Sequence, residues 1–141
     1  MNFLDSKDPI IACSSGGTTN TGIAIIRMSG FDDLSFLKDY LSINYVLIKP
    51  RYAHFCKLID EGVVLDEIIL TFFKGPNSFN SENILELSVH GNIFNIERII
   101  NLFTKKLFFR EAYPGEFSYR AYRNKKLNLT QVEGLDLFLN A

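Results

Sequence analysis

The stretch ILELSVHG, residues 84–91, decides the fold, because its side chains alternate in character one by one. In an extended strand successive side chains point to opposite faces, so this stretch has one apolar and one mostly polar face. The apolar face holds Leu85, Leu87 and Val89, and the opposite face holds Ile84, Glu86, Ser88 and His90. We therefore predict a strand whose polar face either meets water or lines a site.

A helix is predicted directly after this strand. Apolar residues recur every three or four positions over residues 93–107, namely Ile93, Ile96, Ile99, Ile100, Phe103 and Leu107. This period is typical of an amphipathic helix with one face on a core. Further helices are predicted over residues 116–123 and, capped by Asp32 or Asp33, up to Leu41.

Four other apolar runs predict strands, at residues 9–13, 23–30, 52–59 and 63–73. The last two flank Asp60, Glu61 and Gly62, which indicate a hairpin turn. The run at 23–30 is apolar enough to be buried on both faces, apart from Arg27, which needs a partner there. Strands and helices interleave without a regular βαβ repeat, so we predict an α+β domain with a mixed β-sheet covered by helices on one side.

The composition is that of one soluble globular domain: 141 residues, of which 47% are hydrophobic and 22% charged. No apolar run approaches the roughly 20 residues of a membrane helix, and residues 1–10 lack a signal-peptide pattern, so we expect no membrane association and a cytoplasmic location. Cys13 and Cys56 lack CxxC spacing, which favours buried, reduced thiols. The only histidines are His54 and His90, which excludes a three-histidine metal site.

Positive charge gathers in the C-terminal part, although the net charge is only −1. Between residues 98 and 126 two acids, Glu111 and Glu116, stand against eight bases: Arg98, Lys105, Lys106, Arg110, Arg120, Arg123, Lys125 and Lys126. This segment either faces an anion or is an ordinary solvated surface. Residues 14–22, SSGGTTNTG, match neither the P-loop nor the dinucleotide-binding glycine pattern, so no nucleotide phosphate loop is predicted.

Three segments read together resemble one known family. They are GIAIIRMSG (residues 22–30), GPNSFNSENILELSVHGN (75–92) and YPGEFSYRAYRNKKLNLTQVEGL (113–135). In this order they closely resemble motifs of the N-terminal domain of the tRNA wobble-uridine modification GTPases, the MnmE or TrmE family. The resemblance covers residues 10–137.

The resemblance implies a domain similar in fold to the folate-binding domain of aminomethyltransferases. Residues 1–124 would form this folate-binding and homodimerising domain, and residues 125–141 would begin a helical domain. The ligand would be a tetrahydrofolate derivative, 5-formyl- or 5,10-methylene-tetrahydrofolate, which supplies the one-carbon unit placed on C5 of the wobble uridine. The implied partners are a second copy of the chain, a flavoprotein and tRNA.

The same resemblance places GTP, Mg²⁺ and K⁺ in a GTPase domain, whose P-loop signature this chain lacks. We therefore expect the chain alone to be non-catalytic. The last segment predicts one more helix, because Thr130 and Glu133 match a capping box. A helix this short is marginal alone, so we expect the natural protein to continue beyond Ala141 or this segment to dock onto another chain.

The family's folate contacts fall on Arg27, Glu86 and Lys126. A carboxylate such as Glu86 can accept the neighbouring N–H donors of a reduced pterin. The two cations suit the glutamyl carboxylates of the ligand or Glu86 itself. His90, at the end of the same strand, either meets the ligand at the rim of the site or makes a structural hydrogen bond.

The chain departs from the family pattern in three places. Residues 15–20, SGGTTN, lack the arginine of the family's loop, Asn92 replaces a glycine and Asn128 replaces an aspartate. These changes predict either weaker ligand binding or a rearranged loop. Two alternative functions stay open: an assembly-only homodimerisation scaffold without folate binding, and a basic tRNA-contacting module in which Tyr119 and Tyr122 stack on bases.

Overall fold

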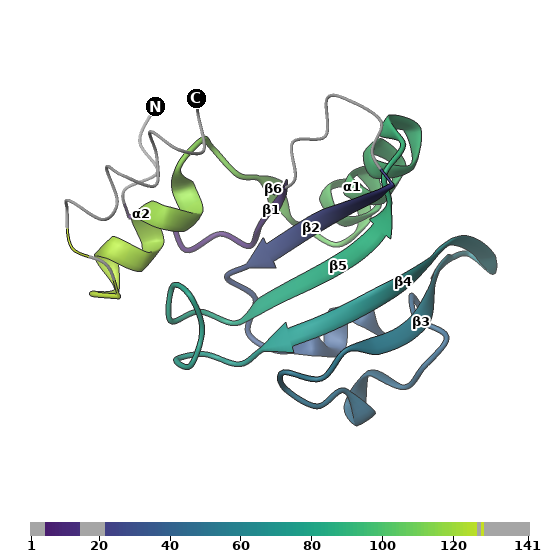
Figure 1. Cartoon of the computed structure of the whole chain (residues 1–141), viewed down its shortest axis with the longest axis horizontal. Coiled ribbons are helices and arrows are strands. Elements are labelled where there is room, and N and C mark those ends of the chain that lie inside the picture. The colour runs from purple at the N-terminus through teal and green to yellow at the C-terminus, as the bar shows by residue number, and fades with distance from the viewer. Residues whose placement is uncertain (1–4, 15–21, 127, 129–141) are drawn as a thin grey trace.

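The computed structural model describes residues 5–14, 22–126 and 128, which contain a six-stranded sheet (Figure 1). The strands are β1 (Ile10–Cys13), β2 (Ile23–Ser29), β3 (His54–Asp60), β4 (Val63–Phe73), β5 (Ile84–His90) and β6 (Arg110–Glu111). Their order in the sheet is β3-β4-β5-β2-β1-β6. Neighbouring strands are antiparallel, except for the parallel pair β1 and β6, so the predicted mixed sheet and α+β class are confirmed.

Two α-helices and two 3₁₀ turns accompany the sheet: α1 (Ile93–Lys106), α2 (Glu116–Arg123), η1 (Leu34–Leu37) and η2 (Tyr45–Leu47). The helix α1 packs on one face, and α2 lies beyond β1 (Figure 1). The predicted alternation of β5 is confirmed, because Leu85, Leu87 and Val89 are at most 2% exposed. They share a core cluster with Ile96 and Ile99 of α1. The opposite face of the sheet therefore carries Glu86.

The hairpin predicted at residues 60–62 joins β3 to β4. Both central residues have positive φ, 50° at Glu61 and 80° at Gly62. Positive φ at both positions is what a two-residue type I′ turn requires, and glycine adopts it without a steric cost. This turn aligns Asp60 with Val63 and so sets the start of the register.

Two predictions about local structure are wrong. β2 is buried on one face only, since Ile23 is 66% exposed and the Arg27 side chain is 32% exposed. The reason is that α1 covers only the other face. The helix predicted up to Leu41 is a single 3₁₀ turn, η1, because Asp39 has a φ of 73° and ends it. Asp33 caps this turn as predicted, accepting a hydrogen bond from the Ser35 N–H at 2.8 Å.

Cys56 is a buried free thiol, whereas Cys13 is only half-buried. Burial raises the pKa of the Cys56 thiol to about 11. Within the described ranges no cluster of three metal-ligating side chains occurs, and no helix has the length and apolar character to cross a membrane. The loop at 15–20 and the helix predicted from Thr130 lie outside the described residues.

Candidate ligand-binding site

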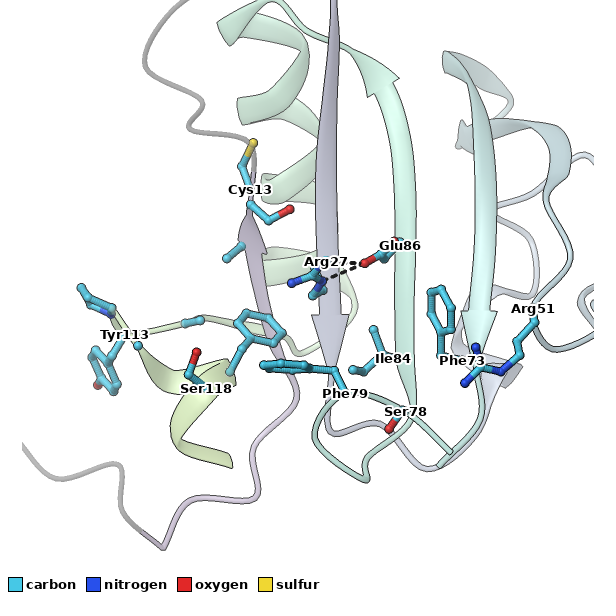
Figure 2. Close-up of a pocket in the computed structure, with 16 residues that line it drawn as sticks. Cys13, Arg27, Arg51, Phe73, Ser78, Phe79, Ile84, Glu86, Tyr113 and Ser118 are labelled. Carbon is cyan, nitrogen blue, oxygen red and sulfur yellow. Dashed lines mark hydrogen bonds and ion pairs between the residues drawn. The ribbon is translucent and has the colours of Figure 1, made fainter. Parts of the chain in front are cut away.

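A pocket of about 780 Å³ lies on the sheet face opposite α1 (Figure 2). Strands β1, β2, β4 and β5 form its floor. Residues 78–79 form one wall, and residues 112–115, 117 and 118, which include the start of α2, form another. This volume is in the range of sites for small organic ligands.

The floor holds the two charged residues that the resemblance assigned to folate binding. Arg27 of β2 and Glu86 of β5 are opposite each other in the antiparallel register. Arg27 donates from Nε at 2.9 Å and from Nη2 at 2.7 Å, and both hydrogen bonds go to Oε2 of Glu86. Oε1 of Glu86 accepts no hydrogen bond from any described residue. Since both side chains are about one-third exposed, this oxygen can accept from a ligand.

Aromatic rings surround this ion pair. The aromatic lining residues are Phe73, Phe79, Tyr113 and Phe117. Figure 2 shows Phe79 between the sheet floor at Ile84 and the helix residue Ser118. A planar ring bound over Glu86 would therefore meet aromatic surface beside a carboxylate acceptor, the combination that suits a heteroaromatic ring with N–H donors.

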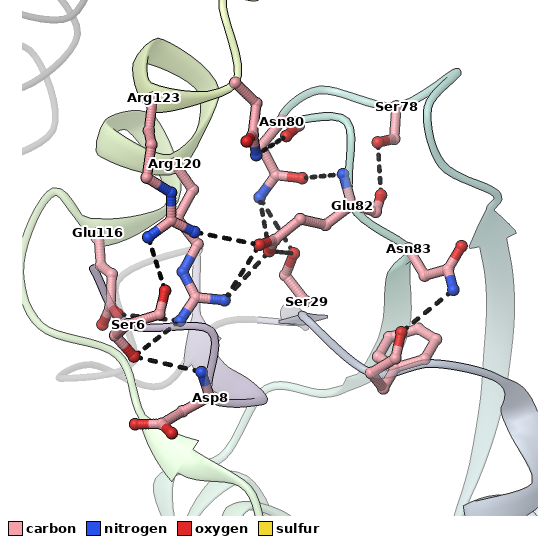
Figure 3. Close-up of polar contacts among 12 residues, drawn as sticks. Ser6, Asp8, Ser29, Ser78, Asn80, Glu82, Asn83, Glu116, Arg120 and Arg123 are labelled. Atoms are coloured by element: carbon pink, nitrogen blue, oxygen red, sulfur yellow. Dashed lines mark hydrogen bonds and ion pairs between the residues drawn. The ribbon is translucent and has the colours of Figure 1, made fainter. Parts of the chain in front are cut away.

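A buried ion-pair cluster connects the two walls (Figure 3). The Arg120 side chain is fully buried and donates to Glu82 at 3.1 Å and to Glu116 at 3.2 Å. Glu82 follows the wall residue Phe79 in the chain, and Glu116 precedes the wall residue Phe117. One guanidinium therefore fixes the spacing between both walls.

Glu116 is also paired with Arg110 at 2.7 Å. Burial would raise the pKa of Glu116, but hydrogen bonds from Arg110 and from the Tyr113 N–H, with the charges of Arg110 and Arg120, lower it below its usual value. On the other side, Glu82 accepts a hydrogen bond from the Ser29 hydroxyl at 2.7 Å. Both carboxylates thus have hydrogen-bond partners from several segments of the chain.

Half of the eight cations in the basic segment at residues 98–126 form ion pairs within the described part of the molecule. Four of its cations pair with carboxylates: Lys106 with Asp60, Arg110 with Asp8 and Glu116, Arg120 with Glu82 and Glu116, and Arg123 with Glu82. Arg98 instead donates to the Leu65 carbonyl. The positive charge of the surface formed by this segment is therefore smaller than the number of its lysines and arginines suggests.

The remaining residues singled out from the sequence lie apart from the floor. Lys126 is exposed just after α2, and its backbone N–H donates to the Ala121 carbonyl at 2.7 Å, but it does not line the pocket. His90 does not line it either. Its Nδ1 lies 2.5 Å from Asp66 Oδ1, and its side chain is 71% exposed, so it makes the structural hydrogen bond that was one of its two predicted roles.

Asp66 itself is almost fully buried beside α1. Burial alone would raise its pKa, but hydrogen bonds from the His90 N–H, from Asn95 and from the His90 ring lower the pKa below its usual value. This group anchors the end of β5 to β4 and α1. It belongs to the scaffold of the sheet and lies outside the pocket lining.

Sequence reasoning missed several lining residues. Phe79 lies in the GPNSFN segment that carried the resemblance, so that segment was a usable signal. Arg51 and Phe73 carried none, because both lie outside the three matching segments: Arg51 precedes β3, and Phe73 ends β4 just before the second segment begins. Only the antiparallel order β4-β5-β2 brings them to the same floor.

Comparisons with known proteins agree with the resemblance. The sequence profile of the family described as GTP-binding protein TrmE N-terminus matches residues 9–126. The tRNA modification GTPase MnmE of Francisella philomiragia is 39% identical over 136 residues, which is 96% of this chain and 29% of that protein. The tRNA modification GTPase MnmE of Aquifex aeolicus is 39% identical over 136 residues, 96% of this chain and 30% of that protein. The chain thus spans about three-tenths of the length of these relatives.

Proposed function

This chain belongs to the family of the GTP-binding protein TrmE N-terminus, and we propose that it is the tetrahydrofolate-binding, homodimerising module of a GTPase that modifies C5 of the tRNA wobble uridine. The relatives are named tRNA modification GTPases. In this proposal the folate supplies the one-carbon unit. GTP, Mg²⁺, K⁺, the flavoprotein partner and tRNA engage other parts of the complete assembly.

The observation that carries the proposal is the open oxygen of Glu86. Arg27 holds the carboxylate through Oε2, and Oε1 of this pocket-lining side chain accepts no hydrogen bond from any described residue. A reduced pterin presents adjacent N–H groups that such a carboxylate accepts, and a charged acceptor makes these hydrogen bonds stronger than neutral ones. The aromatic walls suit the pterin and the p-aminobenzoyl ring. The proposed ligand is 5-formyl- or 5,10-methylene-tetrahydrofolate, and Lys126, although it does not line this pocket, stays a predicted contact for it.

Homodimerisation is supported by apolar side chains on the same sheet face. Phe55 of β3 and Ile69 of β4 are register partners, and they are 68% and 44% exposed. Ile23 of β2 is 66% exposed. An exposed apolar area on a sheet is typical of an interaction surface. Should folate binding fail, this surface favours the second candidate, an assembly-only scaffold.

Isothermal titration calorimetry with 5-formyltetrahydrofolate tests the proposal. We expect the wild-type chain to bind, and Glu86→Gln to lose about tenfold or more in affinity, because one charge-assisted acceptor contributes about 1.5–3 kcal/mol. Arg27→Ala and Lys126→Ala should also weaken binding. Glu67→Gln is the matched control, since Glu67 is exposed on the neighbouring strand and does not line the pocket.

Two outcomes would decide against folate binding. If wild-type protein does not bind, or if affinity is unchanged in the variants at residues 27, 86 and 126, the pocket does not read a pterin. Analytical sedimentation of the same samples then tests the assembly-only scaffold, which is expected to sediment as a dimer without ligand. Salt-dependent binding of tRNA by the chain would instead support the basic module, which the internal ion pairs disfavour.

A further inference from the structure

Arg51 is the charged lining residue that the floor chemistry leaves unused. Among the described residues, three charged side chains line the pocket: Arg27, Arg51 and Glu86. The first and the last neutralise each other at 2.7 Å, whereas Arg51 has no carboxylate partner in the described part of the chain. The lining therefore carries a net charge of about +1, located at Arg51, and favours a ligand that is anionic at that end.

The guanidinium of Arg51 is held in place before any ligand binds. Its Cζ lies 5.5 Å from the centroid of the Phe73 ring, and Nη2 donates to the Asn77 carbonyl at 2.8 Å. Its backbone N–H donates to the Phe72 carbonyl at 2.8 Å, and its φ is 66°. A guanidinium offers five N–H donors, so most remain for a ligand. The stacking reduces the side-chain entropy that binding would otherwise cost.

The position of Arg51 separates it from the Glu86 end of the pocket. Figure 2 shows Arg51 beyond Phe73, on the far side from Arg27. The strands β2, β5 and β4 are consecutive in the sheet, so the strand of Arg27 and the strand of Phe73 are two strand spacings, about 10 Å, apart. A ligand whose ring lies at Glu86 therefore directs its other end across Phe73 toward Arg51.

We propose that Arg51 is the specificity residue for the carboxylate tail of the ligand, which it binds through a two-pronged guanidinium–carboxylate contact. This inference rests on the proposed function, because it takes the ring end of the ligand to be the pterin. The neutral pterin lies at the charge-balanced pair of Arg27 and Glu86. The glutamyl carboxylates lie at the uncompensated cation, and additional glutamyl units add further anions there.

The test compares ligands that share the 5-formyltetrahydropterin ring and differ in the p-aminobenzoyl and glutamyl groups attached to it. Calorimetry of the full 141-residue chain uses 5-formyltetrahydrofolate, its triglutamate, and a tail-less 5-formyl-6-methyltetrahydropterin. We expect Arg51→Gln to lose about tenfold in affinity for the two folates and nothing for the pterin. Arg51→Lys should recover part of the loss. Lys49→Gln is the matched control, because Lys49 is a nearby cation over Tyr52 that does not line the pocket.

The outcomes separate the two proposals. Equal losses for folate and tail-less pterin in Arg51→Gln would mean that Arg51 shapes the pocket and does not read the tail, which overturns this inference and leaves folate binding intact. Unchanged affinity for all three ligands overturns it as well. Absence of binding by the wild-type chain would overturn the proposed function, and the tail assignment with it.

Discussion

Replacing Arg120 by methionine tests whether the buried ion pairs hold the pocket walls together. Arg120 is fully buried, and the change leaves both of its carboxylate partners, Glu82 and Glu116, in place. Breaking a buried pair from one side costs about 3–5 kcal/mol, because the remaining charge stays desolvated. We expect the lower end, about 3 kcal/mol, since Arg110 still pairs with Glu116 and Arg123 with Glu82.

The free energy of unfolding is measured by urea titration followed by circular dichroism, and the melting temperature by a thermal scan. A loss of about 3 kcal/mol corresponds to a decrease in Tm of about 10 °C for a domain of this size. Lys106→Met is the matched control, because Lys106 pairs with Asp60 at 2.8 Å on an exposed surface, where an ion pair contributes little. A loss below about 1 kcal/mol in Arg120→Met, the level of an exposed pair, would refute the reasoning.

Two further predictions concern the sheet and its edges. Because the folded-state pKa of Asp66 is lowered, its contribution to stability is complete above about pH 4, its ordinary pKa, and is lost as the pH falls through the folded value. Asp66→Asn should therefore reduce the decrease in the free energy of unfolding at acid pH, measured by urea titration at several pH values. An unchanged decrease would contradict this. Gly30→Ala should cost about 2 kcal/mol or more, because φ is +88° and a Cβ would lie 2.7 Å from Arg120 Nη1. Gly22→Ala, where a Cβ meets no atom of the described residues within 4 Å, is the control, and equal losses in both variants would argue against strain at Gly30.

Much of the sheet follows from local patterns. Alternation in residues 84–91 and the helical period of residues 93–107 predict β5 and α1 nearly to the residue. The failure at β2 has a clear physical cause. A continuous apolar run with one charge is compatible with burial on two faces or with one face lining a pocket, and only the placement of α1 decides between them.

The candidate site shows the same division. A lone arginine in an apolar strand needs an anion, and a glutamate on the polar face of another strand offers one, so Arg27 and Glu86 could be paired in advance. Arg51 could not be identified as a pocket residue from the sequence, because its neighbours in the chain do not distinguish it from a solvated arginine. The cations of residues 98–126 also suggest a basic surface in the sequence. In the structure, Glu82 and Asp60 from other segments form ion pairs with three of them.

Sequence patterns alone thus specify strands β1 to β5, the helices α1 and α2, the family and the chemistry of the Arg27 and Glu86 pair, because periodicity and the types of side chain are local properties of the chain. The tertiary structure alone decides which sheet face stays open, which cations are neutralised and that Arg51 lies at the far end of the pocket. Those features depend on contacts between residues far apart in the chain, such as the 59 positions that separate Arg27 from Glu86. Strand order and register, which no local pattern encodes, bring them together.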